Sequence, residues 1–368
     1  MASPPVLKFD LLLQPISDDA PAGADVRSDP KASQLYYAVK DARSSARSKE
    51  RSSLAEDGEA PDLPGEWRPV FKQAHELLAH HSKDLEITAW LIEASVRLDG
   101  FAGLRDGFRL ARELIGRFWD PIYPHPDEDG IETTVAPLAG LNGEDGEGTL
   151  IAPIRAALIT GGQSVGPFAT WNYEQAVALE QITDPKKRER RIDAGAVTLR
   201  MIQQAAAETA AQEFVRLHED LQGAQAEFQQ LSAALDERCG NESPPSSNIR
   251  HALEACQEAL TFLAGDKLRP ISAGEPTDAS GGDGAAPAAA GIATTPGQIR
   301  NREDAFKVML DIADFFRRTE PHSLLSYSLE QVVRWGKTPL PQLLSDLIGD
   351  KSAREELFRL TGIPILKE

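Results

Sequence analysis

The chain has 368 residues, of which 41% are hydrophobic and 26% charged, an ordinary composition for a folded protein of two or three domains. Its net charge of −18 argues against nucleic acid or an anionic membrane as the main partner, because both are polyanions. No stretch reaches the ~18 apolar residues of a membrane span and the first residues do not read as a secretory leader, so we expect a cytoplasmic protein without direct membrane insertion.

Residues 1–34 are rich in Pro, Asp, Ala and Gly, which predicts an extended segment laid over the surface of a domain. A short helix over residues 35–46 and a charged loop are expected to follow. Lys40, Arg43 and Arg47 lie at helical spacing, but in so acidic a chain a solvated helix face is favoured over a basic binding stripe.

The next amphipathic helix is expected to begin at Trp67. It carries His75 and ends near His80 and His81, a set that suggests a metal site. No carboxylate or cysteine joins these histidines at ligand spacing, and adjacent histidines point about 100° apart on a helix. We therefore predict no metal and no cofactor.

Residues 82–121 are the segment around which the chain is organised. They predict two helices joined at Leu98-Asp99-Gly100, with Ser82 as the N-cap of the first. The first helix is apolar on nearly every side, which indicates a buried helix. The second is amphipathic and should cover it, until Asp120-Pro121 ends the helical hydrogen bonding.

An acidic loop follows at residues 123–130. Its spacing fails as a calcium loop, because His125 occupies the first ligand position and Ala136 the last. Asp127, Glu128 and Asp129 could form the acid and base of a hydrolase, but nothing apolar nearby would raise a carboxyl pKa, so a solvated loop is favoured. No familiar catalytic motif occurs in the sequence, and we predict no catalytic residues.

The middle of the chain predicts a long helical hairpin. From about Ala207 to Leu235, apolar residues recur at steps of three and four, which is typical of a narrow seam such as a coiled coil. A second helix is expected from Ile249 to Leu263. Cys239 and Cys256 lie too far apart in such a hairpin for a disulfide.

Residues 271–297 consist mainly of Ala, Gly, Pro, Ser and Thr without Lys or Arg, which predicts a flexible linker. Helical patterns resume over residues 299–368, a stretch too short to enclose all of its apolar side chains. We expect some of them to contact another subunit. The candidate assembly interface comprises Phe315, Phe316, Leu324, Leu325, Tyr327 and Trp335.

Two distant groups of residues form a recognisable pattern. The first contains Pro15, Pro21, Gly23, Asp25 and Arg27, and the second contains Asp84, Trp90, Leu91, Gly100, Phe101 and Trp119. In this order they resemble the ImpA N-terminal domain of the TssA family of bacterial type VI secretion, over roughly the first 160 residues. The other similarities, from Tyr173 through Trp335, are looser.

The resemblance implies a non-enzymatic component of a contractile injection machine in a Gram-negative bacterium. Members of the family act at the baseplate and tail, help to assemble the tube and sheath, and form rings through their C-terminal region. The implied partners are further copies of the chain and the baseplate, sheath and tube proteins, with the membrane complex as another candidate. A helical adaptor outside secretion would share the physical features above, and the hydrolase remains the other alternative.

The combined prediction is an all-α protein. Its expected parts are an ImpA N-terminal-like helical domain (1–165), a long helical middle region (166–265), an Ala/Gly/Pro-rich linker (266–298) and a small C-terminal helical assembly domain (299–368).

Overall fold

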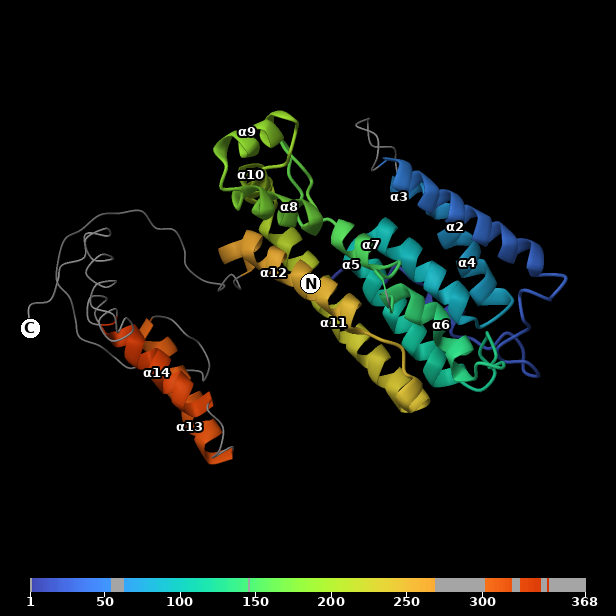
Figure 1. The fold of residues 1–368 in the computed structure, drawn as a ribbon. Coiled ribbons are helices and arrows are strands. Elements are labelled where there is room, and N and C mark those ends of the chain that lie inside the picture. The colour runs from blue at the N-terminus through green and yellow to red at the C-terminus, as the bar shows by residue number, and fades with distance from the viewer. Residues whose placement is uncertain are drawn as a thin grey trace, which may run out of the picture. The chain divides into compact units, whose positions relative to one another are not determined.

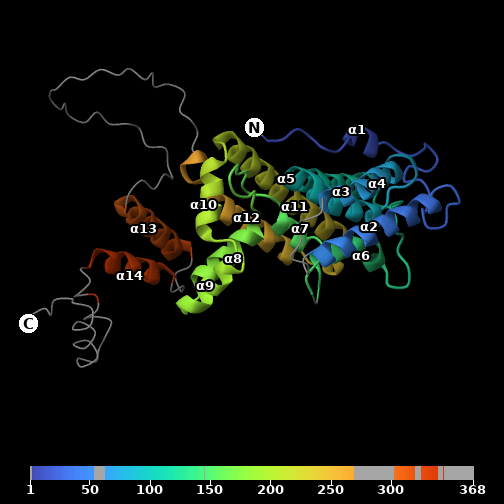
Figure 2. The ribbon, with the colours of Figure 1, turned by 90° about the horizontal axis from the view of Figure 1, so that it is seen from above.

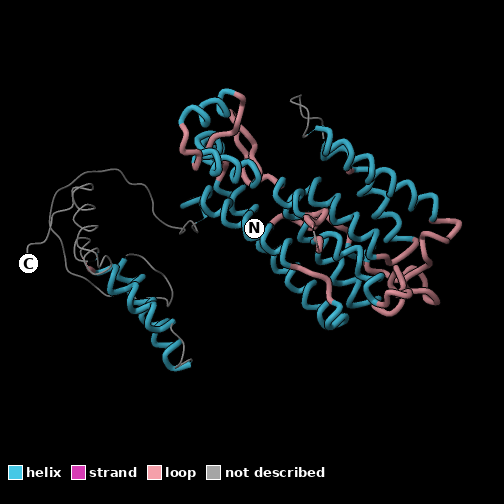
Figure 3. The backbone as a smooth tube through the Cα atoms, viewed as in Figure 1, coloured by secondary structure: helices cyan, strands magenta, loops and turns pink. Residues whose placement is uncertain are grey.

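The computed structural model describes residues 2–53, 63–144, 146–268, 302–319, 325–338 and 343. The chain divides into two compact units, Met1–Gly274 and Glu275–Glu368, which we call unit 1 and unit 2 and describe separately. Within the described residues every regular element is a helix, drawn in cyan in Figure 3, and the β-bridges are isolated. The prediction of an all-α protein is confirmed.

Unit 1 is built from a series of helices that Figure 1 labels in chain order. Their bounds are α1 (Phe9–Leu12), α2 (Ser33–Ser53), α3 (Leu63–Glu66), α4 (Arg68–His80), α5 (Leu85–Phe118), α6 (Ile131–Asn142), α7 (Ile151–Ala156), α8 (Thr170–Glu180), α9 (Pro185–Asp193), α10 (Leu199–Glu208), α11 (Ala211–Cys239) and α12 (Ser247–Ala264). Short 3₁₀ turns, Gly240–Glu242 and Gly265–Leu268, follow α11 and α12.

The large helices of unit 1 pack side by side. Helix α2 contacts α4, α4 contacts α5, α5 contacts α11, and α11 contacts α12, so that they form the succession visible in Figure 1. The short helices α6 and α7 cover α5 and α12. Helix α5 lies near the middle of this succession, as expected for the most apolar segment of the chain.

Helix α5 is itself a hairpin of two arms, residues 85–99 and 101–118. Gly100 has φ 57° and ψ −135°, a backbone conformation that breaks the helix at the joint expected from the sequence. The arms approach closely, because a Cβ on Gly103 would lie 2.1 Å from the carbonyl oxygen of Ser95. The first arm is buried on nearly all sides, as its composition predicted.

Helix α11 runs parallel to the second arm of α5. Arg105 pairs with Asp220 at 2.6 Å, and Arg112 pairs with Glu227 at 2.9 Å. Both members of the second pair stand seven residues after those of the first, about two helical turns along each helix. Helix α11 packs on α5 as well as on α12, and it is shorter than the predicted seam, because Ala207 lies on α10 and α11 begins at Ala211.

The predicted ranges 1–165 and 166–265 share one hydrophobic core. Phe228 on α11 and Cys256 on α12 belong to the same buried cluster as the side chains of α5. The rings of Phe108 and Phe228 lie 4.9 Å apart between centroids, a contact that contributes about 0.5–1.5 kcal/mol beyond the burial of its area. The predicted hairpin of α11 and α12 is present, but it is an integral part of unit 1.

The first 34 residues differ from the predicted surface segment. Leu12 and Val26 are fully buried, and helix α1 packs on α4. The prediction missed these anchors, because a few apolar side chains, spaced by turn residues, are enough to hold an irregular segment against a core. Backbone hydrogen bonds to residues 81–83 hold the same segment in place.

Helix α2 also differs from its prediction, since it continues to Ser53 instead of ending near residue 46. Two charged residues of this helix find partners on α5, since Arg43 pairs with Glu93 and Glu50 with Arg97, whereas Lys49 pairs with Glu66 on α3. Charged side chains such as Arg and Lys favour a helix nearly as well as Leu does, so charge alone does not end one.

Helices α8, α9 and α10 form a small lobe at one end of unit 1, seen at the same end in Figures 1 and 2. Its core consists of Phe168, Ala176, Ile202 and Ala205. The amine of Lys267 ties the end of α12 to this lobe, donating to the carbonyl oxygens of Ala206 and Thr209 at 2.8 and 2.7 Å.

Unit 2 contains two described helices, α13 (Arg302–Thr319) and α14 (Leu325–Lys337), which pack against each other. Phe306, Ala313 and Val333 are buried there. The predicted linker at 271–297 and most of the residues after 338 lie outside the described residues.

Candidate functional site

The first site is a polar network at the start of α5, where the two groups of motif residues meet. Asp84 is the N-cap of the helix, and its Oδ1 accepts hydrogen bonds from the backbone amides of Glu86 and Ile87 at 2.8 and 3.2 Å. Ser82 was the predicted cap. It lies two residues too early, in an isolated β-bridge with Gly23.

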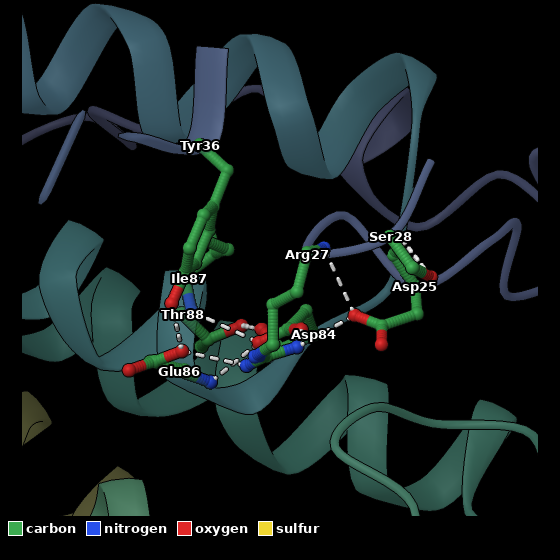
Figure 4. A network of polar contacts seen from close by, with 8 residues as sticks. All are labelled: Asp25, Arg27, Ser28, Tyr36, Asp84, Glu86, Ile87 and Thr88. Atoms are coloured by element: carbon green, nitrogen blue, oxygen red, sulfur yellow. Dashed lines mark hydrogen bonds and ion pairs between the residues drawn. The ribbon is translucent and has the colours of Figure 1, made fainter. Parts of the chain in front are cut away.

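Arg27 connects the N-terminal segment to this helix start. Its guanidinium pairs with Asp84 at 2.8 Å, Glu86 at 2.6 Å and Asp25 at 3.0 Å, as Figure 4 shows. The hydroxyl of Tyr36 on α2 donates to the same Glu86 carboxylate at 3.1 Å. Three elements of unit 1 are thus joined by one arginine and the carboxylates around it.

The pKa values in this network follow from burial and charge. Burial is the largest influence on the pKa of Arg27 and lowers it, but the Asp84 and Glu86 charges and the hydrogen bonds to Asp84 and Asp25 together outweigh it, so the net shift is upward. Burial raises the pKa of the Asp84 carboxyl against the opposing pull of Arg27. Burial and the Glu86 charge raise the pKa of Tyr36 to about 12. The network therefore contains one permanent cation and a phenol that stays protonated at neutral pH.

Gly23 and Lys83 bring the N-terminal segment against the loop before α5. Gly23 has φ 78°, and a Cβ there would lie 2.0 Å from the carbonyl oxygen of His81. The amine of Lys83 is fully buried and donates to the carbonyl oxygens of Leu12 and Leu78 at 2.8 and 2.7 Å. Burial lowers the pKa of this amine to about 8.

The remaining motif residues lie in or beside the core. Trp90, Leu91 and Phe101 are buried, whereas Trp119, at the C-terminal end of α5, and Pro21 are only partly so. Pro15 is exposed. The structure brings Gly23, Asp25, Arg27 and Asp84 together but leaves Gly100 and Trp119 elsewhere in unit 1.

A buried ion pair beside Trp90 escaped the sequence analysis. Arg43 on α2 binds the fully buried carboxylate of Glu93 through Nε and Nη2 at 2.5 and 3.0 Å. Its guanidinium also lies 5.7 Å from the centre of the Trp90 ring, and Tyr36 stacks on that ring at 5.5 Å. Arg43 therefore forms an intramolecular ion pair with α5 and does not belong to a solvated helix face. The sequence signal for this ion pair was Glu93, a charged residue in a helix that is otherwise apolar on nearly every side.

The polar network and this ion pair border a groove of about 450 Å³ between α2, α5 and α6. Its lining includes the apolar residues Ala89, Trp90 and Pro137. Arg27 and Arg43 also line it, but both are already paired with carboxylates. The groove can hold an apolar side chain or a turn of polypeptide, and its polar groups have no evident catalytic arrangement.

The acidic loop is an exposed turn. The Asp127 carboxylate accepts hydrogen bonds from the Thr133 hydroxyl and from the backbone amide of Asp129, the latter at 3.0 Å. The Thr133 hydrogen bond, followed by the backbone ones, lowers the pKa of Asp127. A general acid in a hydrolase requires the opposite shift. This loop therefore does not favour the hydrolase alternative.

The histidines and cysteines are not gathered into a site. Among the described residues no three His, Cys, Asp or Glu side chains are placed to hold a metal ion. Cys239 and Cys256 are both free, and burial raises the pKa of Cys256 to about 12. In the part of the chain that the structure describes, no helix is long and apolar enough to span a membrane.

The candidate assembly residues of unit 2 lie on α13 and α14. Phe315, Tyr327 and Trp335 are 55%, 62% and 38% exposed, while Phe316 is partly buried. Leu310, Ile312 and Val332 are exposed on the same two helices. Leu324 and the side chain of Leu325 lie outside the described residues.

Comparisons with known proteins agree on one family. Residues 13–143 match the family model described as ImpA, N-terminal, type VI secretion system. The chain is 28% identical over 362 residues to the type VI secretion system component TssA1 of Pseudomonas aeruginosa, a match that covers 96% of this chain and 98% of that protein.

A solved structure extends this agreement to the fold. It is the N-terminal domain, including the conserved ImpA_N region, of the TssA component of the type VI secretion system from Burkholderia cenocepacia. The TM-score is 0.59 at 28% identity, and the match covers 71% of this chain and 94% of that one. The family model, the full-length relative and the fold point the same way, and the chain belongs to the TssA family of type VI secretion system components.

Proposed function

We propose that this protein is a non-enzymatic assembly component that acts at the baseplate of the type VI secretion system and in the building of its tube and sheath. In this proposal, unit 1 contacts other components of the apparatus from the cytoplasmic side, and unit 2 joins copies of the chain into a ring. The observation that carries the proposal is the set of large apolar side chains exposed on α13 and α14.

These side chains favour association because exposed aromatic area is costly in water. Phe315, Tyr327 and Trp335 are among the residue types enriched in the centres of protein interfaces. Burying one such side chain against a partner stabilises by roughly 1.5–3 kcal/mol. A second copy of unit 2 offers the same apolar residues, so a symmetric assembly buries them in every subunit.

The membership of the family supports secretion over a helical adaptor of another pathway. The matched relatives are described as TssA components of the type VI secretion system, and the physical features of this chain fit such a component. Two discriminating measurements are the mass of the assembly and the activity of the secretion system.

The test of self-association uses the full-length chain. Phe315→Asp and Tyr327→Asp together place two charges on the proposed interface, and we expect the mass measured by native mass spectrometry to fall from that of an oligomer to that of a monomer. The matched control is Phe262→Asp on α12, a residue that is 57% exposed in unit 1. The control should keep the assembly, and an unchanged mass of the double variant would place the interface elsewhere.

The same variants test the role in secretion. Cells that carry the double variant in place of the wild-type chain should lose export of the tube protein, whereas cells with the control should keep it. Removal of residues 299–368 should leave unit 1 folded and abolish both assembly and secretion. If the truncated chain kept the full mass in sedimentation, the seam of α11 would be the next candidate interface.

A further inference from the structure

Helix α9, in the small lobe, is the most basic segment of this acidic chain. Its residues 185–193 read PKKRERRID and include five Lys or Arg side chains. None of the nine residues is buried, and none belongs to the core of the lobe. The helix is held by its local chemistry, because Pro185 occupies the first turn and the Asp184 carboxylate accepts hydrogen bonds from the amides of Lys186 and Lys187 at 3.0 and 3.4 Å.

Four of the cations share one face of α9. At about 100° per residue, Lys186, Lys187, Arg190 and Arg191 fall within an arc of roughly 140°. Arg188 points to the other side, where it pairs with Glu180 at 3.4 Å. Within the described part of the chain, the four residues of the shared face form no ion pair. We call these four residues the α9 basic face.

This arrangement is electrostatically unfavourable in the isolated chain. Lys186 and Arg190, and likewise Lys187 and Arg191, are like-charged pairs four residues apart, which weaken a helix. Lys186 and Lys187 also stand in the first turn, where the helix dipole disfavours positive charge, and the carboxylate of Asp184 at the N-cap offsets this in part. A negatively charged partner relieves the remaining repulsion between the like-charged pairs.

We propose that the α9 basic face is a docking surface for an acidic segment of polypeptide. Carboxylates suit it, because Arg binds them through two parallel hydrogen bonds and Lys through a compact ammonium group. The face is about two helical turns long, which matches a short acidic segment. The inference rests on unit 1 alone and does not depend on self-association through unit 2.

Nucleic acid is another polyanion that could bind this face, but the net charge of the whole chain disfavours it. The net charge is −18, so a long duplex laid on α9 would meet repulsion from the rest of the protein. The helix carries no aromatic side chain on which a base could stack. A short acidic peptide contacts the basic face and avoids that wider repulsion.

The test measures binding of a fluorescent oligo-glutamate peptide of about ten residues to the full-length protein by anisotropy at low salt. The variant replaces all four residues of the face by Gln, which removes the charge and keeps the length of most side chains. Its affinity should fall by about tenfold or more, and the affinity of the wild type should fall as salt is added.

The matched control makes the same change in net charge elsewhere. Lys31, Arg51, Arg68 and Lys72 are exposed on or near α2 and α4, and their joint replacement by Gln should leave most of the affinity intact. Equal losses in the two variants would mean that only net charge matters and would overturn the proposal. Tighter binding of a duplex DNA of matched charge through the same face would overturn it in favour of nucleic acid.

A measurement on the unchanged protein avoids dependence on variant folding. Carbodiimide joins a carboxylate to a lysine amine only when the two are in direct contact. Cross-links from the peptide should concentrate at Lys186 and Lys187 when mapped by mass spectrometry. Cross-links spread over other exposed lysines, such as Lys31 and Lys72, would contradict a specific docking surface.

Discussion

The guanidinium of Arg105, on the second arm of α5, donates a hydrogen bond of 2.6 Å to the carboxylate of Asp220 on α11. Both side chains are largely withdrawn from water, with exposed fractions of 15% and 5%. The same carboxylate accepts hydrogen bonds from the amide and the hydroxyl of Ser3 at 2.9 and 2.5 Å. One aspartate therefore joins three parts of the chain that are far apart in sequence.

Asp220→Ala should destabilise unit 1 by about 3 kcal/mol, because it leaves a buried arginine without its main partner. The remaining contact of Arg105 with Asp106, at 2.9 Å, limits the loss. Urea unfolding followed by tryptophan fluorescence measures the effect. Glu227→Ala is the matched control on the same pair of helices, where the more exposed pair with Arg112 should contribute about 1 kcal/mol or less. Equal losses would show that burial of the first pair is unimportant.

Trp90→Ala should destabilise unit 1 by roughly 3–5 kcal/mol, the usual cost of removing a large buried aromatic side chain. Trp90 is only 4% exposed, stacks on Tyr36 and lies beside Arg43. The midpoint of thermal unfolding should fall by several degrees. Trp171→Ala changes the same residue type at a site that is 36% exposed and should have a much smaller effect. An unchanged midpoint for Trp90→Ala would contradict its place in the core.

Gly23→Ala should destabilise unit 1 by more than 1 kcal/mol, because alanine is strained at φ 78° and its Cβ would collide with the carbonyl of His81. Gly116→Ala provides the opposite case. Gly116 lies on an exposed side of α5, and nothing lies within 4 Å of a Cβ there. This second change should stabilise the helix by about 0.5–1 kcal/mol. Chemical denaturation of the two variants should give shifts of opposite sign.

Stability should depend on pH through the buried amine of Lys83. Its pKa is about 8 in the folded chain and 10.5 in its ordinary state. Between these values the unfolded chain binds more protons, so the contribution of this group to the free energy of unfolding rises as pH increases from about 8 toward 10.5. Below this window the cost of burying the ammonium is at its greatest.

Lys83→Met isolates this effect. Relative to the variant, the wild type should gain about 1 kcal/mol of unfolding free energy between about pH 7.5 and about pH 9. Urea titrations at the two pH values provide the measurement. Cys256 and Tyr36 have raised pKa values and act in the opposite direction, but they are present in both proteins and cancel in the comparison. Parallel pH profiles of the two proteins would contradict the assignment.

Much of unit 1 follows from local rules of sequence. The joint at Gly100 was predictable because glycine tolerates the backbone conformation that reverses a helix. The burial of the first arm of α5 followed from apolar residues on all of its sides. The N-cap of α5 was harder to predict, since Ser82 and Asp84 are both favourable cap residues. Only the pairing of Ser82 with Gly23 decides between them.

Contacts between residues that are far apart in the sequence could not be predicted from local patterns. The periodicity of α11 predicts that something covers its seam, but no local pattern says that α5 does so in parallel register. In the same way, Arg43 has the composition of a solvated helix face, and only the fold reveals its bond to Glu93. The candidate residues of unit 2 were selected by residue type, and the exposure of Phe315, Tyr327 and Trp335 is a property of the folded helices.

The packing of α11 on α5 bears on how the protein should be divided for experiments. The family match ends at residue 143, well before α11 begins at Ala211. A fragment cut at that point would expose Phe108 to water and leave Arg105 without Asp220. Such a fragment would expose a large apolar surface to water and would tend to aggregate. The smallest piece worth expressing alone extends through Leu268, where the last turn after α12 ends.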